Sequence, residues 1–444
     1  MARLIIKNIG PIKHVDIELN KINVIIGEQS SGKSTICKIA SFCTWVEKTV
    51  SLEQETFPIT KTFKEKLETF HKLQGYFNDN SEITYTSDII SIHYKYSTLI
   101  EFNNVGRWSF KRPKIEYIPA ERNMVGAIPN WFSVKLQDNN ILSFMTDWGD
   151  SRLIYTKDNS LPILNLNAAY YYDESKQEDS IRMQNGKTIK LAVASSGLQS
   201  AIPLLALFTA YTERMQDITQ LSSYQNKIQT NRTIESIKPK IERDHEIIER
   251  ISSQIRYRTS RRRDESNPTP LPEFEMLHYE NVSIKIKPGT ATEITQLLDN
   301  FVKTQYVSFF IEEPELNLFP ATQRILTHQL VKGTLKGDNK LFITTHSPYI
   351  LTVLNNLLLA KRIVTKNPSA EDEVLKIIDG NSLLSSSDFS AYSLINHENR
   401  GVTAESIINC NTGLIDQNYL DTVSEILSNE FSKLYDIHSK FYKR

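Results

Sequence analysis

Short apolar stretches open the chain, and their spacing predicts strands. Residues 4–7 form one stretch, and apolar residues alternate with polar ones through residues 15–19 in a second. Residues 22–26 are almost continuously apolar, which is typical of a strand buried on both faces of a sheet. A helical pattern follows from Lys33. This order predicts a strand, a turn and a helix in close succession.

Three later apolar stretches also predict strands. They cover residues 115–118, 306–311 and 341–345. The second runs into two glutamates and the third into a histidine, as buried parallel strands do at their carboxyl ends. Ligands bind at that edge of an open α/β sheet. The fold class is therefore expected to be α/β.

The middle of the chain predicts a hairpin and a helix. Alternating apolar residues flank Asn185-Gly186 on both sides, which is the strongest short hairpin signal. A helical pattern runs on from Leu204, with Pro203 near its expected start, where a proline costs least. Residues 49–109 are mixed and polar, and they favour no particular structure.

Residues 216–268 read as a helical insertion with a coiled-coil pattern. Isoleucines recur every seven residues and also fill the alternate seam position. They are Ile234, Ile237, Ile241, Ile248, Ile251 and Ile255. We expect the straight helix to begin at Pro239. The seam needs a partner, which could be the helix from Leu204, the insertion of another protomer or a different protein.

A basic run closes this insertion. It consists of Arg256, Arg258, Arg261, Arg262 and Arg263. Three interpretations stay open, namely a solvated tip, a contact with nucleic acid and a contact with protein. Replacing Arg261, Arg262 and Arg263 with alanine would test the nucleic-acid interpretation through the affinity and salt dependence of nucleic-acid binding.

Composition narrows the class of protein. The chain has 444 residues, which allows two or three domains, and 40% of them are hydrophobic. Lys+Arg and Asp+Glu both number 52, so no global basic field favours nucleic acid, although a local patch still could. Cys37, Cys43 and Cys410 fit neither a zinc site nor a disulfide framework. With no apolar run of membrane-spanning length and no signal-peptide pattern, we expect a cytoplasmic protein without membrane contact.

The turn after residues 22–26 fits the P-loop pattern, a glycine, four residues and then Gly-Lys-Ser. Its backbone N–H groups and the positive end of the next helix suit phosphates. Lys33 would reach the β- and γ-phosphates of ATP, and Ser34 would offer its hydroxyl to Mg²⁺. The expected nucleotide contacts are Gly27, Gln29, Ser30, Ser31, Gly32, Lys33, Ser34 and Thr35.

The acidic pair and the histidine complete this hypothesis. Glu312 is placed to hold Mg²⁺ through water, and Glu313 to orient the water that attacks the γ-phosphate. His346 could hydrogen-bond that phosphate. The plainer alternatives are an acidic solvated turn and a structural histidine, and the nearby P-loop pattern favours the catalytic interpretation. Residues 195–199 offer a second anion site at a helix start, although alone they read as an ordinary N-cap.

These four motifs, in this order, resemble the ABC ATPases. Residues 27–35 are similar to Walker A and residues 311–313 to Walker B, with Glu312 where most relatives have aspartate. Residues 195–199 resemble the Leu-Ser-Gly-Gly-Gln signature, with Ser195 replacing leucine and Leu198 replacing the second glycine. The resemblance implies that Ser196, Gly197 and Gln199 contact the nucleotide. His346 resembles the switch histidine.

One branch of that family is closer, namely the OLD nucleases and the Septu-type defence ATPase, with RecF and SMC more distant. Its typical phrases stand at residues 118–122, 195–200, 312–315 and 344–348. The resemblance implies an ABC-type ATPase head with an N-terminal antiparallel β subdomain, a central P-loop sheet and a helical coiled-coil insertion. The expected parts are 1–215 and 269–365 for the head, 216–268 for the insertion, and 366–444 for a helical extension.

The family also implies a mechanism. Two protomers sandwich two ATP molecules, and Ser196 and Gly197 of one close on the γ-phosphate held by Lys33 of the other. Relatives have a glutamine that senses Mg²⁺ after a lobe-linking strand. Here Glu121 stands at about that place and is a weak candidate for it.

Three hypotheses for the function of the chain stay open. OLD nucleases carry a TOPRIM domain, whose strand ending in Glu-Gly and later Asp-x-Asp do not follow His346 here. The leading reading is therefore an ATPase that controls a separate effector, a nuclease among the candidates, in bacterial defence against phage. The alternatives are a DNA-maintenance ATPase of the RecF or SMC kind and an ATP-binding scaffold with negligible turnover.

Overall fold

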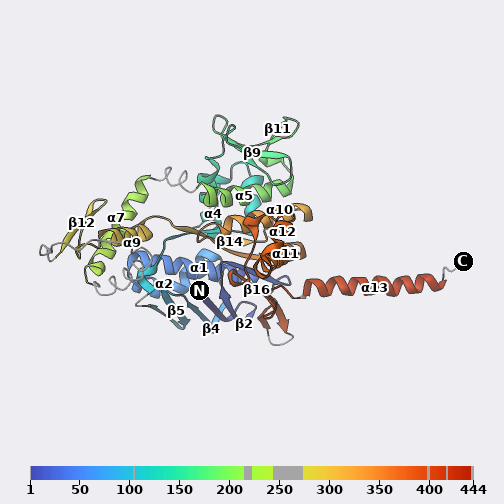
Figure 1. Ribbon diagram of the computed structural model, residues 1–444, viewed down its shortest axis with the longest axis horizontal. Coiled ribbons are helices and arrows are strands. Elements are labelled where there is room, and N and C mark those ends of the chain that lie inside the picture. Colours follow the sequence, from blue (N-terminus) through green and yellow to red (C-terminus); the bar gives the residue numbers. More distant parts are fainter. Residues whose placement is uncertain are drawn as a thin grey trace.

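The computed structural model describes residues 2–103, 106–135, 137–214, 223–243, 274–397, 401–416 and 419–441 (Figure 1). The helices are α1 Lys33–Glu53, α2 Phe57–His71, α3 Met124–Ala127, α4 Asn140–Arg152, α5 Ser196–Glu213, α7 Ser223–Ile241, α9 Ala291–Val302, α10 Pro320–Leu335, α11 Pro348–Lys366, α12 Glu371–Leu375 and α13 Tyr419–Phe441. None of these helices is long and apolar enough to span a membrane.

The strands make one large sheet and two small ones. They are β1 Ala2–Ile9, β2 Ile12–Leu19, β3 Ile22–Gly27, β4 Phe77–Thr86, β5 Ile90–Lys95, β6 Ser97–Phe102, β7 Pro113–Ile118, β8 Leu161–Pro162, β9 Ala168–Asp173, β10 Glu178–Met183, β11 Thr188–Lys190, β12 Glu275–Tyr279, β13 Val282–Ile286, β14 Tyr306–Glu312, β15 Lys340–Thr345, β16 Phe389–His397 and β17 Gly401–Ser406. The predicted hairpin at Asn185-Gly186 is confirmed, since β10 and β11 pair antiparallel across it.

The large sheet has 11 strands in the order β6-β5-β4-β1-β2-β17-β16-β3-β15-β14-β7. The first five pair antiparallel, whereas β16, β3, β15, β14 and β7 run parallel to one another. β17 joins the two parts by pairing with β2. The predicted α/β head, with an antiparallel N-terminal part and a central P-loop sheet, is confirmed.

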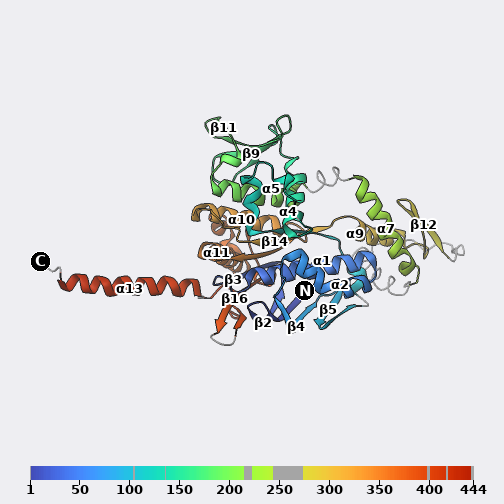
Figure 2. The ribbon, with the colours of Figure 1, turned by 180° about the vertical axis from the view of Figure 1, so that it is seen from behind.

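Helices cover both faces of the parallel strands (Figure 1, Figure 2). In β14, Val307, Phe309 and Ile311 belong to the apolar core that contains α5, α10 and α11. Phe310 points to the other core, which contains α1 and α2. Each such side chain contributes about 1.5–3 kcal/mol through burial. A strand buried on both faces needs the continuous apolar run that predicted it.

Parallel register brings the functional ends of the strands to one edge. Glu312 is paired with Thr344, and Thr344 is paired with Ile25 on the other side. Ile118 is the partner of Ile311. The segments that follow β3, β7, β14 and β15 therefore leave the sheet together at its carboxyl edge, as expected for an open α/β sheet.

The predicted helical extension at 366–444 is wrong in part. β16 inserts beside β3 as a buried central strand, and β17 returns antiparallel to it. The sequence pattern did not predict β16, because serines interrupt its apolar positions. Ser390 and Ser393 are buried within the sheet, and Ser390 accepts a hydrogen bond from Asn20. Only a tertiary neighbour supplies such a partner, so a local pattern does not show it.

The insertion also differs from its prediction. α7 runs through Pro239 instead of beginning there. Ile234, Ile237 and Ile241 are fully buried in a cluster with residues of α9 and β13, so this part of the seam is covered by its own chain. Its partner is neither α5 nor a second protomer. Ile248, Ile251, Ile255 and the arginines at 256–263 lie outside the described residues.

Candidate nucleotide site

The turn between β3 and α1 forms a loop with open backbone donors. α1 begins at Lys33, and its N-cap, Gly32, has no side chain to bond the first N–H groups. These groups have no partner within the helix, so they suit an anion. Gly32 has a φ of 96°, and an added Cβ would lie 2.9 Å from Cγ1 of Ile12. A glycine is therefore required at this position for two independent reasons.

Lys33 lies inside this loop. Its ammonium donates to the carbonyl oxygens of Gly27 and Glu28 at 2.8 and 2.6 Å, and the residue is 6% exposed. Burial lowers its pKa to about 8, against the attraction of Glu313 and Glu315. The loop thus holds a cation where phosphates would enter. Gln29 and Ser30 are exposed, whereas Ser31 and Thr35 are buried.

Glu312 is held by two hydroxyl groups. Ser34 Oγ donates to its Oε2 at 2.9 Å, and the Tyr117 hydroxyl donates to its Oε1. The carboxylate is 6% exposed, and burial raises its pKa, while the Tyr117 hydrogen bond lowers it. Both oxygens therefore have a fixed orientation at the foot of the P-loop.

This donor set fits Mg²⁺. Mg²⁺ keeps several waters and takes one or two protein carboxylates together with phosphate oxygens. The Ser34 hydroxyl and the Glu312 carboxylate supply such a pair. Within the described ranges no cluster of three or more His, Cys, Asp and Glu side chains forms, so an all-protein metal cage is not seen there.

Glu313 and His346 face each other beside this pair. Glu313 Oε1 lies 3.7 Å from His346 Nε2, and each side chain is 32% exposed. Glu313 has a left-handed backbone, with φ at 44°, and its N–H donates to the Thr344 carbonyl. Burial, followed by the charge of Lys33, lowers the pKa of His346. The His346 imidazole and a solvent-accessible carboxylate therefore stand together at the sheet edge.

Glu315 fixes the strand end that carries His346, a role that sequence reasoning missed. Its Oε1 accepts from the His346 N–H at 2.7 Å and from Thr345 Oγ1 at 2.8 Å. Glu315 is the last residue of the Glu-Glu-Pro-Glu phrase at residues 312–315. Its spacing alone did not indicate a contact with β15.

Arg122 is a second residue that sequence reasoning missed. It is fully buried and donates to the backbone carbonyls of Glu312 at 2.7 Å, Glu313 at 2.6 Å and Ser200 at 3.1 Å. Burial lowers its pKa to about 10. One guanidinium thus connects the acidic pair with the first turns of α5. The phrase at 118–122 pointed to this segment, but only the fold shows what its arginine bonds.

The signature-like loop makes its own set of contacts. α5 begins at Ser196, which is exposed together with Ser195, and no side chain caps the helix. An added Cβ on Gly197 would lie 2.8 Å from the Asn317 carbonyl oxygen. Gln199 donates to the carbonyls of Leu191 and Ala192 rather than pointing to a ligand.

The expectation for Pro203 is corrected by the structure, and the expectation for Glu121 stays a prediction. Pro203 lies in the interior of α5 and not near its start, since the helix begins at Ser196, where residues 195–199 had indicated a helix start. Glu121 is exposed after β7, and its charge is one of the causes that raise the pKa of Glu312. It therefore lies near the acidic pair, but its contact with Mg²⁺ stays a prediction.

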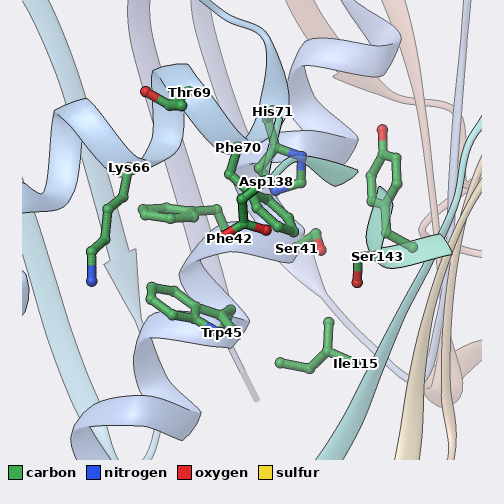
Figure 3. Close-up of a pocket in the computed structure, with 11 residues that line it drawn as sticks. Ser41, Phe42, Trp45, Lys66, Thr69, Phe70, His71, Ile115, Asp138 and Ser143 are labelled. Atoms are coloured by element: carbon green, nitrogen blue, oxygen red, sulfur yellow. The ribbon is translucent and has the colours of Figure 1, made fainter. Parts of the chain in front are cut away.

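A cavity of about 420 Å³ lies behind Tyr117, lined by α1, α2 and β7 (Figure 3). His71 is 1% exposed there, its Nδ1 has no hydrogen-bond partner, and burial lowers its pKa to about 3. Its ring lies 5.2 Å from the Tyr117 ring, edge to face. Tyr117 therefore stands between an aromatic cavity and Glu312, and its ring position depends on this packing.

Comparisons with known proteins agree with this geometry. Residues 293–351 match the family model of an AAA ATPase domain. The matched segment contains Glu312, Glu313 and His346, and with the P-loop on the same sheet it supports ATPase activity for the chain. No curated protein matches the chain.

Several solved structures are similar to this chain, with low TM-scores and low sequence identity. The SMC head domain from Thermotoga maritima has 9% identity and a TM-score of 0.36, covering 91% of this chain and 98% of its own. An SMC head bound to the C-winged helix domain of ScpA has 9% identity and a TM-score of 0.35, covering 91% and 96%. The SMC head with an extended coiled coil from Pyrococcus furiosus, bound to the C-terminal domain of ScpA, has 10% identity and a TM-score of 0.30, covering 97% and 99%. At these scores the fold assignment rests on the sheet topology itself.

Tyr117→Phe should raise the Mg²⁺ concentration needed for half-maximal phosphate release. Without its hydroxyl donor, a buried carboxylate oxygen of Glu312 is left unpaired, which costs about 1–3 kcal/mol. Activity should then require more Mg²⁺. Tyr85→Phe is the matched control, because Tyr85 is equally buried and donates to Glu47, a different carboxylate. Equal Mg²⁺ titrations for both variants would show that Tyr117 does not position Glu312.

Proposed function

We propose that the chain is an ATP-binding and hydrolysing dimeric switch that controls a partner effector. One observation supports the ATP-binding and hydrolysing part of this proposal. Lys33 in the P-loop, the Ser34–Glu312 pair and the Glu313–His346 pair lie at one edge of one sheet. Together they provide a phosphate-binding cation, a place for Mg²⁺ and a carboxylate for water.

In this proposal each residue has a separate task. Lys33 exchanges its carbonyl partners for the β- and γ-phosphates, and the α1 N–H groups bind the same anion. Ser34 and Glu312 would hold Mg²⁺, which supplies charge neutralisation for the phosphates. Glu313 orients water and accepts its proton, and His346 donates a hydrogen bond to the γ-phosphate. Positioning and electrostatics account for most catalysis of phosphoryl transfer.

The second half of the site is proposed to come from another protomer. Ser195 and Ser196 are exposed at an uncapped helix start, so their N–H and hydroxyl groups face solvent and suit an anion. Arg122 provides a physical route from this helix to the acidic pair, because it bonds Ser200 and both glutamate carbonyls. We infer that closure on ATP and its hydrolysis are transmitted through this arginine.

The biological setting is proposed from sequence. The motif phrases of the OLD and Septu-like branch, without a TOPRIM pattern, favour a separate effector such as a nuclease in bacterial defence. We retain 1–215 and 269–365 as parts of the head around an insertion at 216–268, and we add β16 and β17 to the head because they pair within its sheet. The DNA-maintenance alternative depends on Arg256–Arg263, outside the described residues.

Steady-state phosphate release separates the main readings. The purified chain with ATP and Mg²⁺ should release phosphate continuously, and a rate no greater than that of Lys33→Ala would favour the ATP-binding scaffold. Repeating the assay with duplex DNA over a range of salt tests the DNA-maintenance reading, which requires binding that weakens steeply with salt.

Ser196→Arg should lower phosphate release while leaving ATP binding to a single protomer intact. A long cation at the start of α5 would obstruct the γ-phosphate that arrives from the second protomer. Equilibrium binding of a fluorescent ATP analogue measures the first property and phosphate release the second. Ser386→Arg, at another exposed serine, is the control. Reduced ATP affinity in the isolated protomer would place this loop beside its own P-loop instead.

A further inference from the structure

Helix α13 carries large apolar side chains that remain at the surface. Six of them have exposed fractions between 50% and 69%, namely Ile426, Leu427, Phe431, Leu434, Tyr435 and Ile437. In both views the helix extends away from the sheet and its covering helices (Figure 1, Figure 2). A helix of this kind is expected to bury its apolar side against another surface.

The spacing of these side chains is that of a helix pair. Leu420, Leu427, Leu434 and Phe441 recur at intervals of seven, and Phe431 fills the alternate seam position between two of them. Ser424 and His438 occupy the other two alternate positions, so the seam is apolar through the heptad positions and Phe431. Such a seam packs knobs into the holes of a second helix. The surface therefore fits an α-helix rather than a flat partner.

The distribution of charge along α13 indicates which helix pairs with it. Its first half, residues 419–430, holds Asp421, Glu425 and Glu430 and no lysine or arginine. Its second half, residues 431–441, holds Lys433 and Lys440, with Asp436 as the one acidic residue. A second copy running antiparallel brings each acidic half beside a basic half, whereas a parallel copy brings like charges together. Antiparallel helices also align their dipoles favourably.

We propose that α13 pairs antiparallel with α13 of a second copy of this chain. The pairing uses no nucleotide, so it is a dimer contact distinct from the ATP-dependent closure proposed for the catalytic head. It keeps two heads tethered at high effective concentration while ATP is absent. Experiments on nucleotide-free protein test it without reference to the ATP site.

The mass of the nucleotide-free full chain tests the seam. Light scattering at micromolar concentration should give twice the chain mass or an even multiple. Leu427→Asp with Leu434→Asp should raise the dissociation constant by roughly a hundredfold or more, because each change puts a charge in an apolar seam. Asn429→Asp with Ser432→Asp adds the same charge, again one in each half, at exposed positions away from the seam and should leave the mass unchanged. A monomeric wild type, or a leucine variant with wild-type mass, would overturn the proposal.

Charge reversal tests whether the partner of α13 is a second copy of this chain. Glu425→Lys with Glu430→Lys gives both halves of the helix a net positive charge, and Lys433→Glu with Lys440→Glu gives both halves a net negative charge. Each variant alone should be monomeric, and an equimolar mixture should restore the dimer. The restored dimer also shows that both variants are folded. A mixture that stays monomeric would contradict self-pairing and point to a different partner for α13.

Discussion

Glu313→Gln should abolish steady-state phosphate release while ATP remains bound. The amide cannot accept a proton from the attacking water, and loss of a general base typically lowers turnover by about 10²–10⁴-fold. The Ser34–Glu312 pair is untouched by this change, so affinity for ATP and Mg²⁺ should persist. Phosphate release and retention of radiolabelled ATP, measured on the same preparation, check both halves of the prediction.

Glu312→Gln is the informative comparison for this variant. It removes the charge that Ser34 and Tyr117 orient, so binding of Mg²⁺ and ATP should weaken together. If Glu312→Gln retained ATP without hydrolysis while Glu313→Gln lost ATP, the two carboxylates would have exchanged roles.

Lys33→Ala should lower ATP affinity by roughly a hundredfold or more. Lys33 is the cation held inside the loop, and each charge-assisted hydrogen bond to a phosphate contributes about 1.5–3 kcal/mol. Isothermal titration with ATP and Mg²⁺ measures the loss. Lys21→Ala is a matched control, since Lys21 also donates to a backbone carbonyl, that of Gly337. Wild-type affinity in Lys33→Ala would disprove the P-loop assignment.

The sequence predicted those parts of the fold whose pattern is local. A continuous apolar run identified β3 and β14, and Asn185-Gly186 identified a hairpin. β16 escaped because its serines find their partners across the sheet. The periodicity of Ile234 and Ile241 correctly predicted that both are buried, but the predicted packing partner was wrong. Heptad spacing indicates that a seam is buried and does not indicate which element covers it.

In the candidate site, too, the sequence predicted the residues of local motifs and not those that depend on tertiary contacts. Motifs placed Lys33, Glu312 and His346, because a phosphate loop and strand-end carboxylates have fixed spacing. Arg122 and Tyr117 were not predicted, since one bonds only backbone carbonyls and the other reaches Glu312 from a neighbouring strand. Contacts of this type depend on strand order, which the sequence pattern alone does not determine.

A mixed dimer tests the central claim, a catalytic site shared between two protomers. Lys33→Ala and Ser196→Arg chains with different affinity tags are co-expressed and purified as the mixed species. Each homodimer should be inactive, and the mixed dimer should recover about half of the wild-type rate, because one of its two symmetry-related sites is intact. Phosphate release that stays at the background of either homodimer would contradict a shared site.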